Sequence, residues 1–235
     1  MAIAKIYNRI AHHGAGALYA PGNTLDAVHI GIDAGCDMIE VDVRETQDHV
    51  LVLSHATARK IDNRDIPILR HTFGEWQELT GETDSVPLTS LEDVLLAAES
   101  RNVGLLLDLK DTGLENALAR LIRRMQVDTS AIMVGVPSEP SRVVLRSLDP
   151  NIPIAHKIEP HETSGFKADI ISQLATDAVF WPANLITKER VAKLKAKDII
   201  VYAGPANTSQ EMRRLRNECK VDGIITEFPD LLKTI

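Results

Sequence analysis

Apolar runs of strand length alternate with helical patterns along the whole chain. Eight of these runs are predicted as β-strands: residues 9–12, 37–43, 103–110, 131–136, 152–156, 178–181, 199–203 and 223–226. The intervening segments have helical patterns, and they cover residues 24–34, 90–100, 113–126, 138–147, 167–174, 187–196 and 209–219, with a short terminal helix from Pro229. Strict alternation of this kind predicts parallel strands joined by helical crossovers.

Eight strand–helix units can close into a (β/α)8 barrel or lie open as a doubly wound sheet. The first predicted strand is not followed by the Gly-x-Gly-x-x-Gly pattern of dinucleotide-binding folds, which favours the barrel. The length of 235 residues is also close to the roughly 250 of a typical barrel. We therefore predict one TIM-barrel domain over residues 1–235, with the polar residues 56–87 as an insertion over the barrel mouth.

Composition narrows the partners that the protein is expected to have. The formal net charge of −7 argues against nucleic acid, whose binders usually carry a basic surface. No apolar run approaches the roughly 18 residues of a membrane span, and the N-terminus lacks a signal-peptide pattern. Cys36 and Cys219 have no motif spacing, so no disulfide is expected. We predict a cytoplasmic protein that acts on a small molecule, and the sequence leaves its oligomeric state open.

Two acidic residues interrupt the second predicted strand, at residues 38–43 (MIEVDV). Alternate side chains of a strand share a face, so Glu40 and Asp42 point the same way and the apolar residues between them point the other. In a barrel both carboxylates enter the lumen, where they repel each other unless a cation joins them. The alternative is an edge strand with solvated acids, and the flanking apolar residues argue against it.

A third acid, Asp108, lies in a run of leucines near the end of the next predicted strand, at residues 105–110 (LLLDLK). An acid in such a run needs a partner, which is either a metal ion or the neighbouring Lys110. We favour Asp108 as a metal ligand beside Glu40 and Asp42, and keep the Asp–Lys pair as the alternative. Three carboxylates without cysteine predict Mg²⁺ or Ca²⁺ rather than zinc.

Two histidines stand where TIM barrels place catalytic groups, at the C-terminal ends of strands. His12 ends the first predicted strand, and His55 follows the short apolar run 50–54. Imidazole titrates near neutrality, so we predict these two as a general acid–base pair. Apart from His13 beside His12, the other histidines are interpreted as structural or exposed: His29, His49, His71, His156 and His161.

A series of short motifs follows one another along the chain. They are residues 11–14 (AHHG), 21–24 (PGNT), 40–42 (EVD), 55–56 (HA), 108–110 (DLK) and 221–229 (VDGIITEFP). Their order and spacing resemble the glycerophosphodiester phosphodiesterase family of the phospholipase-C-like superfamily. That family's pattern reads Ala-His-Arg-Gly, Pro-Glu-Asn-Thr, Glu-x-Asp, His-Asp, Glu-x-Lys and Val-Asp-Gly-Ile-x-Thr-Asp-x-Pro.

The resemblance implies a metal-dependent enzyme that hydrolyses a glycerophosphodiester to an alcohol and glycerol 3-phosphate. It implies that His12 and His55 form the acid–base pair. It also implies that Glu40, Asp42 and Asp108 bind the metal and that Lys110 contacts the phosphate. The implied cofactor is a divalent cation, Mg²⁺ or Ca²⁺.

Several positions depart from the family pattern. His13 replaces an arginine, so we expect a weaker and pH-dependent phosphate contact there. Gly22 replaces a glutamate and Ala56 replaces an aspartate. We expect Trp181 and Tyr202, together with the insertion, to shape the pocket for the alcohol, whose identity the sequence does not give.

Two other functions stay open at this point. The replacements at His13, Gly22 and Ala56 suggest a barrel that binds a phosphorylated ligand without turning it over. A metal-dependent carbon–carbon lyase on the same fold is a further candidate, because a fold does not fix a function.

Overall fold

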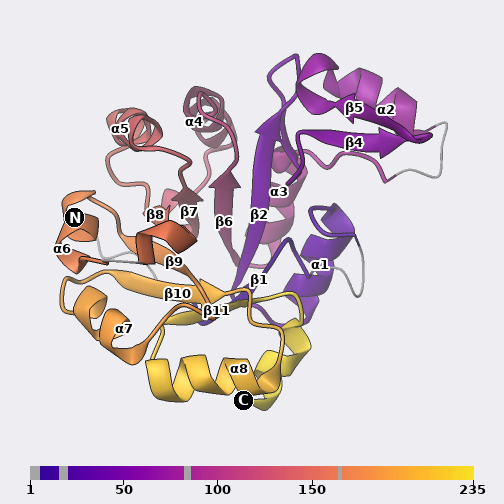
Figure 1. Cartoon of the computed structure of the whole chain (residues 1–235). Helices are drawn as coiled ribbons and strands as arrows, with labels where there is room; N and C mark the ends of the chain where they lie inside the picture. Colours follow the sequence, from indigo (N-terminus) through magenta and orange to yellow (C-terminus); the bar gives the residue numbers. More distant parts are fainter. Residues whose placement is uncertain (1–5, 16–20, 82–85, 164–165) are drawn as a thin grey trace.

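A closed parallel barrel forms the centre of the computed structural model, which describes residues 6–15, 21–81, 86–163 and 166–235 (Figure 1). Eight strands make it: β1 (Arg9–Ala11), β2 (Met38–Glu45), β6 (Gly104–Leu109), β7 (Ile132–Gly135), β8 (Ile154–Lys157), β9 (Ala178–Pro182), β10 (Ile200–Gly204) and β11 (Gly223–Thr226). Each is hydrogen-bonded to its neighbours in parallel, and β1 pairs with both β11 and β2, which closes the ring. The predicted (β/α)8 barrel is confirmed, and all eight predicted strands are present.

Helices connect the strands and surround the barrel (Figure 1). They are α1 (Leu25–Asp33), α3 (Leu91–Ser100), α4 (Glu115–Met125), α5 (Glu139–Leu148), α6 (Ala168–Gln173), α7 (Lys188–Lys195) and α8 (Ser209–Arg213), with short 3₁₀ turns η2 (Thr129–Ala131), η3 (Pro160–Thr163) and η5 (Pro229–Thr234). Thr24, Ser90 and Thr187 cap the helices that follow them, because each side-chain oxygen accepts a bond from a backbone amide in the first turn. The predicted helix 209–219 changes at its middle into a π-helix, η4 (Arg214–Cys219).

The alternation of side chains along the strands divides the core into two layers. Outward residues such as Ile39, Val41 and Leu107 pack against the helices. Inward residues such as Met38 and Leu106 meet in the barrel lumen. The same rule that sends Met38 into the lumen sends Glu40 and Asp42 there as well, two and four positions further along β2.

The insertion after β2 folds into a small unit of its own. The strand β3 (Leu51–Leu53) pairs antiparallel with β2, and then come the hairpin β4 (Ala58–Ile61) and β5 (Arg64–Pro67), the turn η1 (Ile68–Arg70) and helix α2 (Phe73–Gly81). Trp76 is fully buried among apolar residues of this unit, which gives the segment its own core. In Figure 1 the hairpin and α2 stand beside the C-terminal end of β2.

Two further expectations from the sequence concern cysteines and membranes. Cys36 and Cys219 are both buried and unbonded to each other, so the expectation of no disulfide is confirmed. Among the described residues, no helix combines the length and the apolar character that crossing a bilayer requires.

Candidate active site

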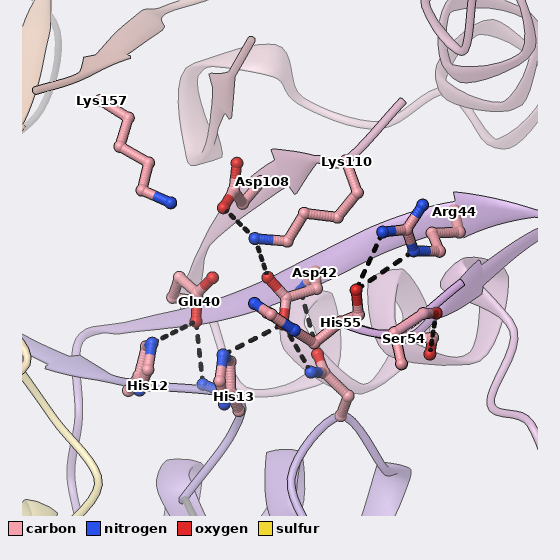
Figure 2. A network of polar contacts seen from close by, with 12 residues as sticks. His12, His13, Glu40, Asp42, Arg44, Ser54, His55, Asp108, Lys110 and Lys157 are labelled. Carbon is pink, nitrogen blue, oxygen red and sulfur yellow. Dashed lines mark hydrogen bonds and ion pairs between the residues drawn. The ribbon is translucent and has the colours of Figure 1, made fainter. Parts of the chain in front are cut away.

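Three carboxylates meet at the C-terminal end of the barrel, as the sequence predicted. Glu40 and Asp42 point into the lumen from β2, and the register of β2 against β6 sets Asp42 directly beside Asp108. Each residue offers an oxygen atom, and these three atoms lie within 4.8 Å of one another (Figure 2). Strand pairing therefore brings together acids that are 68 positions apart in the sequence.

Lys110 lies between two of these acids. Its Nζ is 2.6 Å from Asp42 Oδ1 and 2.6 Å from Asp108 Oδ2. Burial by itself lowers the pKa of Lys110, but the charges of Asp108 and Asp42 outweigh it and raise the pKa above its usual value. Asp108 therefore forms the pair with Lys110 that we kept as the alternative, and it also belongs to the acid cluster.

Glu40 is the member of the cluster whose charge is least compensated. The residue is 5% exposed, and Oε2 accepts a hydrogen bond from the backbone amide of His13 at 2.9 Å. Burial, followed by repulsion from Asp42, raises the pKa of Glu40 to about 8. A buried carboxylate with this pKa indicates a place where a cation would be favourable.

Asp42 is held in place from several sides. Asn23 donates from Nδ2 to Asp42 Oδ2 at 2.7 Å, and its Oδ1 accepts from the Asp42 amide at 2.9 Å. Burial tends to raise the pKa of Asp42, but the hydrogen bond from His13 and the charge of Lys110 lower it well below its usual value. Asp42 is therefore ionised at neutral pH.

His12 lies at the edge of this cluster with both ring nitrogens directed at carboxylates. Nδ1 is 3.3 Å from Glu227 Oε1, and Nε2 is 3.9 Å from Glu40 Oε2. Burial, and then the neighbouring His13, lower the pKa of His12 to about 3. The ring is thus neutral at physiological pH, and Glu227 is placed to fix the proton on Nδ1 and leave Nε2 as the acceptor.

His13 turns back against the cluster from a left-handed backbone conformation, with φ of 52°. Its ring stacks on His12 with centroids 3.7 Å apart, and Nε2 lies 3.0 Å from Asp42 Oδ2. Burial disfavours the charged ring, but the hydrogen bond to Asp42 and the charge of Glu40 outweigh it and raise the pKa of His13. His13, which we expected to contact the phosphate, therefore has its Nε2 paired with the Asp42 carboxylate.

His55 follows β3 and lies on the side of the cluster away from His12 (Figure 2). Arg44 holds the backbone at this point, donating from Nη2 to the His55 carbonyl at 2.9 Å while pairing with Asp111. The His55 ring is exposed, and its centroid is 5.9 Å from that of His13. The two histidines predicted as an acid–base pair are thus separated by the His13 ring.

A cavity of about 180 Å³ opens over this cluster. Its lining includes both predicted catalytic histidines, His12 and His55, together with His13, Lys110 and the three acids. Lys157, at the end of β8, extends towards Asp108 and Glu40 from the opposite wall (Figure 2). The cavity therefore combines carboxylates, imidazoles and ammonium groups within one small volume.

Two predicted pocket residues lie elsewhere. Trp181 is 1% exposed and faces the helical layer, where it meets Phe166 edge-on and the guanidinium of Arg190 at 5.4 Å. Tyr202 lies in the lumen near the opposite end of the barrel, and its hydroxyl accepts a bond from the Tyr7 amide at 3.4 Å. Neither residue lines the cavity over the acids.

Sequence reasoning gave no role to Asn23, Lys157 or Glu227. Asn23 and Glu227 stand inside the quoted motifs PGNT and VDGIITEFP, so the motifs contained the signal that the residues belong to the site. Glu227 is itself held by Asn207, whose Nδ2 donates to Glu227 Oε2 at 3.2 Å. Lys157 has no such motif, and only the closure of the barrel brings it to the cavity.

The acid cluster fits a hard divalent cation. Carboxylate oxygens are the ligands that Mg²⁺ and Ca²⁺ prefer, and no cysteine takes part. Lys110 pairs with Asp42 and Asp108 rather than with Glu40, and burial together with Asp42 raises the pKa of Glu40, so a cation beside Glu40 would favour its ionised form. Glu40, Asp42 and Asp108 are therefore the residues that would hold the ion.

The fold and the site define a TIM barrel whose acids and imidazoles gather at the C-terminal ends of the strands, where barrel enzymes carry their active sites. The chain belongs to the glycerophosphoryl diester phosphodiesterase family, whose pattern it matches over residues 12–231. This places it among the phosphoric diester hydrolases and confirms the resemblance seen in the motifs.

Individual relatives agree with the family and the fold. The chain is 26% identical over 245 residues to the uncharacterized protein YqiK of Bacillus subtilis, with 94% of each chain covered. Its structure is similar to a phosphodiesterase of Oleispira antarctica in complex with the product sn-glycerol-3-phosphate, with TM-score 0.83, 19% identity, and 97% and 96% of the two chains covered. A glycerophosphodiester phosphodiesterase of Thermotoga maritima gives TM-score 0.80 and 19% identity, with 97% of each chain covered.

Proposed function

We propose that the protein hydrolyses a glycerophosphodiester to an alcohol and glycerol 3-phosphate in the cavity over Glu40, Asp42 and Asp108, with a divalent cation bound there. The observation that carries the proposal is the convergence of His12, His55 and the acid cluster on one cavity of about 180 Å³. The bound product of the Oleispira antarctica relative, sn-glycerol-3-phosphate, supports the substrate class.

Glu40, Asp42 and Asp108 would hold Mg²⁺ or Ca²⁺. When bound, such an ion supplies Lewis acidity to phosphate oxygens and lowers the pKa of a coordinated hydroxyl group. Lys110 keeps Asp42 and Asp108 oriented towards each other, because its Nζ lies 2.6 Å from an oxygen of each. Asn23 fixes the second oxygen of Asp42, so the side chain has little freedom to rotate.

His12 is suited to the role of general base. Burial favours the neutral ring, and the contact between Nδ1 and Glu227 leaves Nε2 directed at the acid cluster. A neutral imidazole at this place accepts the proton of the adjacent glycerol hydroxyl as that oxygen attacks phosphorus and the P–O bond to the alcohol breaks. The adjacent carboxylates then face an imidazolium ion, which stabilises the charge that His12 gains during the step. Water then opens the resulting cyclic phosphate to give glycerol 3-phosphate.

His55 is suited to the complementary role of general acid. Its ring lines the same cavity as His12, beyond the His13 ring, and is exposed, so it can exchange protons with solvent between turnovers. We assign it to protonate the oxygen of the leaving alcohol. Lys110 and Lys157 lie on the cavity wall as ammonium groups, and they offset negative charge that develops on the phosphoryl oxygens.

Incubation of the protein with glycerophosphodiesters and Mg²⁺ or Ca²⁺ tests the proposal, with enzymatic detection of released glycerol 3-phosphate. We expect multiple turnovers per protein molecule. Saturable binding of the diesters by calorimetry without any release of product would instead identify a barrel that binds its ligand and has lost catalysis. Absence of both binding and turnover for all diesters would reject the substrate class.

A further inference from the structure

A second and larger cavity adjoins the catalytic one. It has a volume of about 570 Å³ and lies between the barrel mouth and the insertion that contains β4 and α2. That volume falls in the range of about 300–1,000 Å³ that small-molecule sites usually occupy. His13 and His55 line both cavities, so a substrate that spans the two would pass the histidine that we assign to the leaving group.

The charged groups on the walls of this second cavity are cationic. Arg59 and Lys60 come from β4, and over residues 6–15, 21–81, 86–163 and 166–235 no aspartate or glutamate lines the cavity. Arg59 is fixed in place, because its guanidinium donates to the backbone carbonyls of Leu53, Val86 and Pro87. Burial lowers the pKa of Arg59, but a guanidinium stays protonated under all physiological conditions.

Two of the departures from the family pattern lie on the wall of this same cavity. Gly22 stands where the motif has glutamate, and Ala56 stands where it has aspartate. Neither position therefore contributes a carboxylate to the cavity wall. A side chain at position 22 would also begin 2.9 Å from the Cβ atom of His13, so glycine lets the His13 side chain pack closely against this turn.

Within the described ranges of the chain, Trp76 is the only Trp, Tyr or Phe that lines this cavity, and it offers no cage for a cation. Trp76 is fully buried, its Nε1 donates to the Ile68 carbonyl, and the His71 ring lies edge-on to it. Recognition of choline usually depends on the exposed faces of aromatic rings, which attract the quaternary ammonium group. Arg59 and Lys60 would repel such a group in the space that remains.

We propose that the second cavity receives the leaving alcohol and selects an uncharged polyol, such as glycerol or inositol, over choline or ethanolamine. This inference rests on the proposed function for the position of the phosphodiester in the first cavity. Hydroxyl groups suit the site because Lys60 and the His55 ring offer polar contacts without requiring a charge on the alcohol. A positively charged alcohol would have to enter beside two cations, the fixed guanidinium of Arg59 and the exposed side chain of Lys60.

The test compares kcat/KM for glycerophosphoglycerol and glycerophosphoinositol with kcat/KM for glycerophosphocholine and glycerophosphoethanolamine. We expect the polyol diesters to be favoured about tenfold, as one partly screened like charge near the substrate predicts. Lys60→Glu should shrink this ratio by reversing one charge of the cavity. Lys188→Glu makes the same change on an exposed position of α7, outside both cavities, and should leave the ratio as it is.

Binding to the His12→Ala variant separates this inference from the proposed function. Calorimetry with glycerophosphoinositol and glycerophosphocholine in the presence of Ca²⁺ reports the preference without any turnover. Tighter binding of the inositol compound supports the inference even if the wild-type protein hydrolyses neither. Equal or tighter binding of the choline compound, or a preference that Lys60→Glu does not alter, would overturn it.

Discussion

The two ends of the barrel lumen use the same strands for opposite purposes. At the C-terminal end the lumen holds Glu40, Asp42, Asp108 and Lys110 around a cavity. At the N-terminal end, Met38 on the same strand β2 belongs to an apolar cluster with the rings of Tyr7 and Tyr202. A shift of two residues along one strand therefore separates a closed core from a charged cavity.

Close packing at the N-terminal end depends on small residues. A Cβ atom added at Gly104 would lie 2.4 Å from the Tyr7 ring, and one added at Gly223 would lie 2.2 Å from the Tyr7 carbonyl oxygen. Space at these glycines lets the Tyr7 side chain close the lumen. The comparison indicates that the N-terminal end provides stability and the C-terminal end provides chemistry, as in other barrels of this class.

Removal of divalent cations should have the largest effect on activity. The acid cluster would lose the positive charge that offsets the buried Glu40 carboxylate. We expect EDTA to reduce hydrolysis of glycerophosphodiesters to background, and an excess of Mg²⁺ or Ca²⁺ to restore it. The thermal midpoint of unfolding, measured in parallel, checks that the barrel stays folded in chelator. Undiminished turnover in EDTA after dialysis would remove the cation from the proposed mechanism.

Substitution of the two histidines is expected to rank next. His12→Ala and His55→Ala should each lower kcat by about 10²–10⁴-fold, the usual contribution of a general acid or base. His29→Ala is the matched control, because His29 is exposed on α1 and lines neither cavity. Steady-state kinetics with each purified variant decides the question, and near-normal kcat in either catalytic variant would reject that histidine's role.

Loss of the contact between Glu227 and His12 should have a smaller effect. Glu227→Gln keeps an oxygen near His12 Nδ1 but removes the charge, and we expect kcat to fall by about 10- to 100-fold with KM little changed. Nitrogen NMR of the imidazole should show the Nδ1–H tautomer of His12 in the wild type and a mixture in the variant. A pure Nδ1–H tautomer in Glu227→Gln would show that another group fixes the proton.

Much of this arrangement could be predicted from the sequence, and the limits have physical causes. Alternation along β2 gives the face on which Glu40 and Asp42 lie, and the motifs give the partners His12 and Asp108. Alternation also leaves two faces to choose between, and Trp181, which we expected at the pocket, lies on the face that packs against the helices.

Depth within the lumen is the second limit. Tyr202 does point inward, but it lies at the level of Met38 rather than that of Glu40, and a period of two residues does not distinguish the two levels. Lys157 lines the site although no sequence pattern indicated it, because only closure of the barrel brings it there. Contacts that depend on the strand register of a whole sheet are not contained in any local pattern.

Removal of a large side chain at the N-terminal end of the barrel lumen should lower stability and leave the chemistry intact. Its expected effect on turnover is the smallest of these changes. Tyr202→Ala removes a fully buried ring next to Tyr7 and should lower the free energy of unfolding by about 3–5 kcal/mol, as urea denaturation would measure. The acid cluster lies at the other end of the lumen, so kcat of the folded fraction should stay within about twofold, a change of less than about 0.5 kcal/mol in the barrier. Trp181→Ala offers a parallel case in the helical layer, where the side chain is also buried and lies outside both cavities. A large loss of kcat in a folded Tyr202→Ala protein would mean that the two ends are coupled, and that the division of labour along the strands is incomplete.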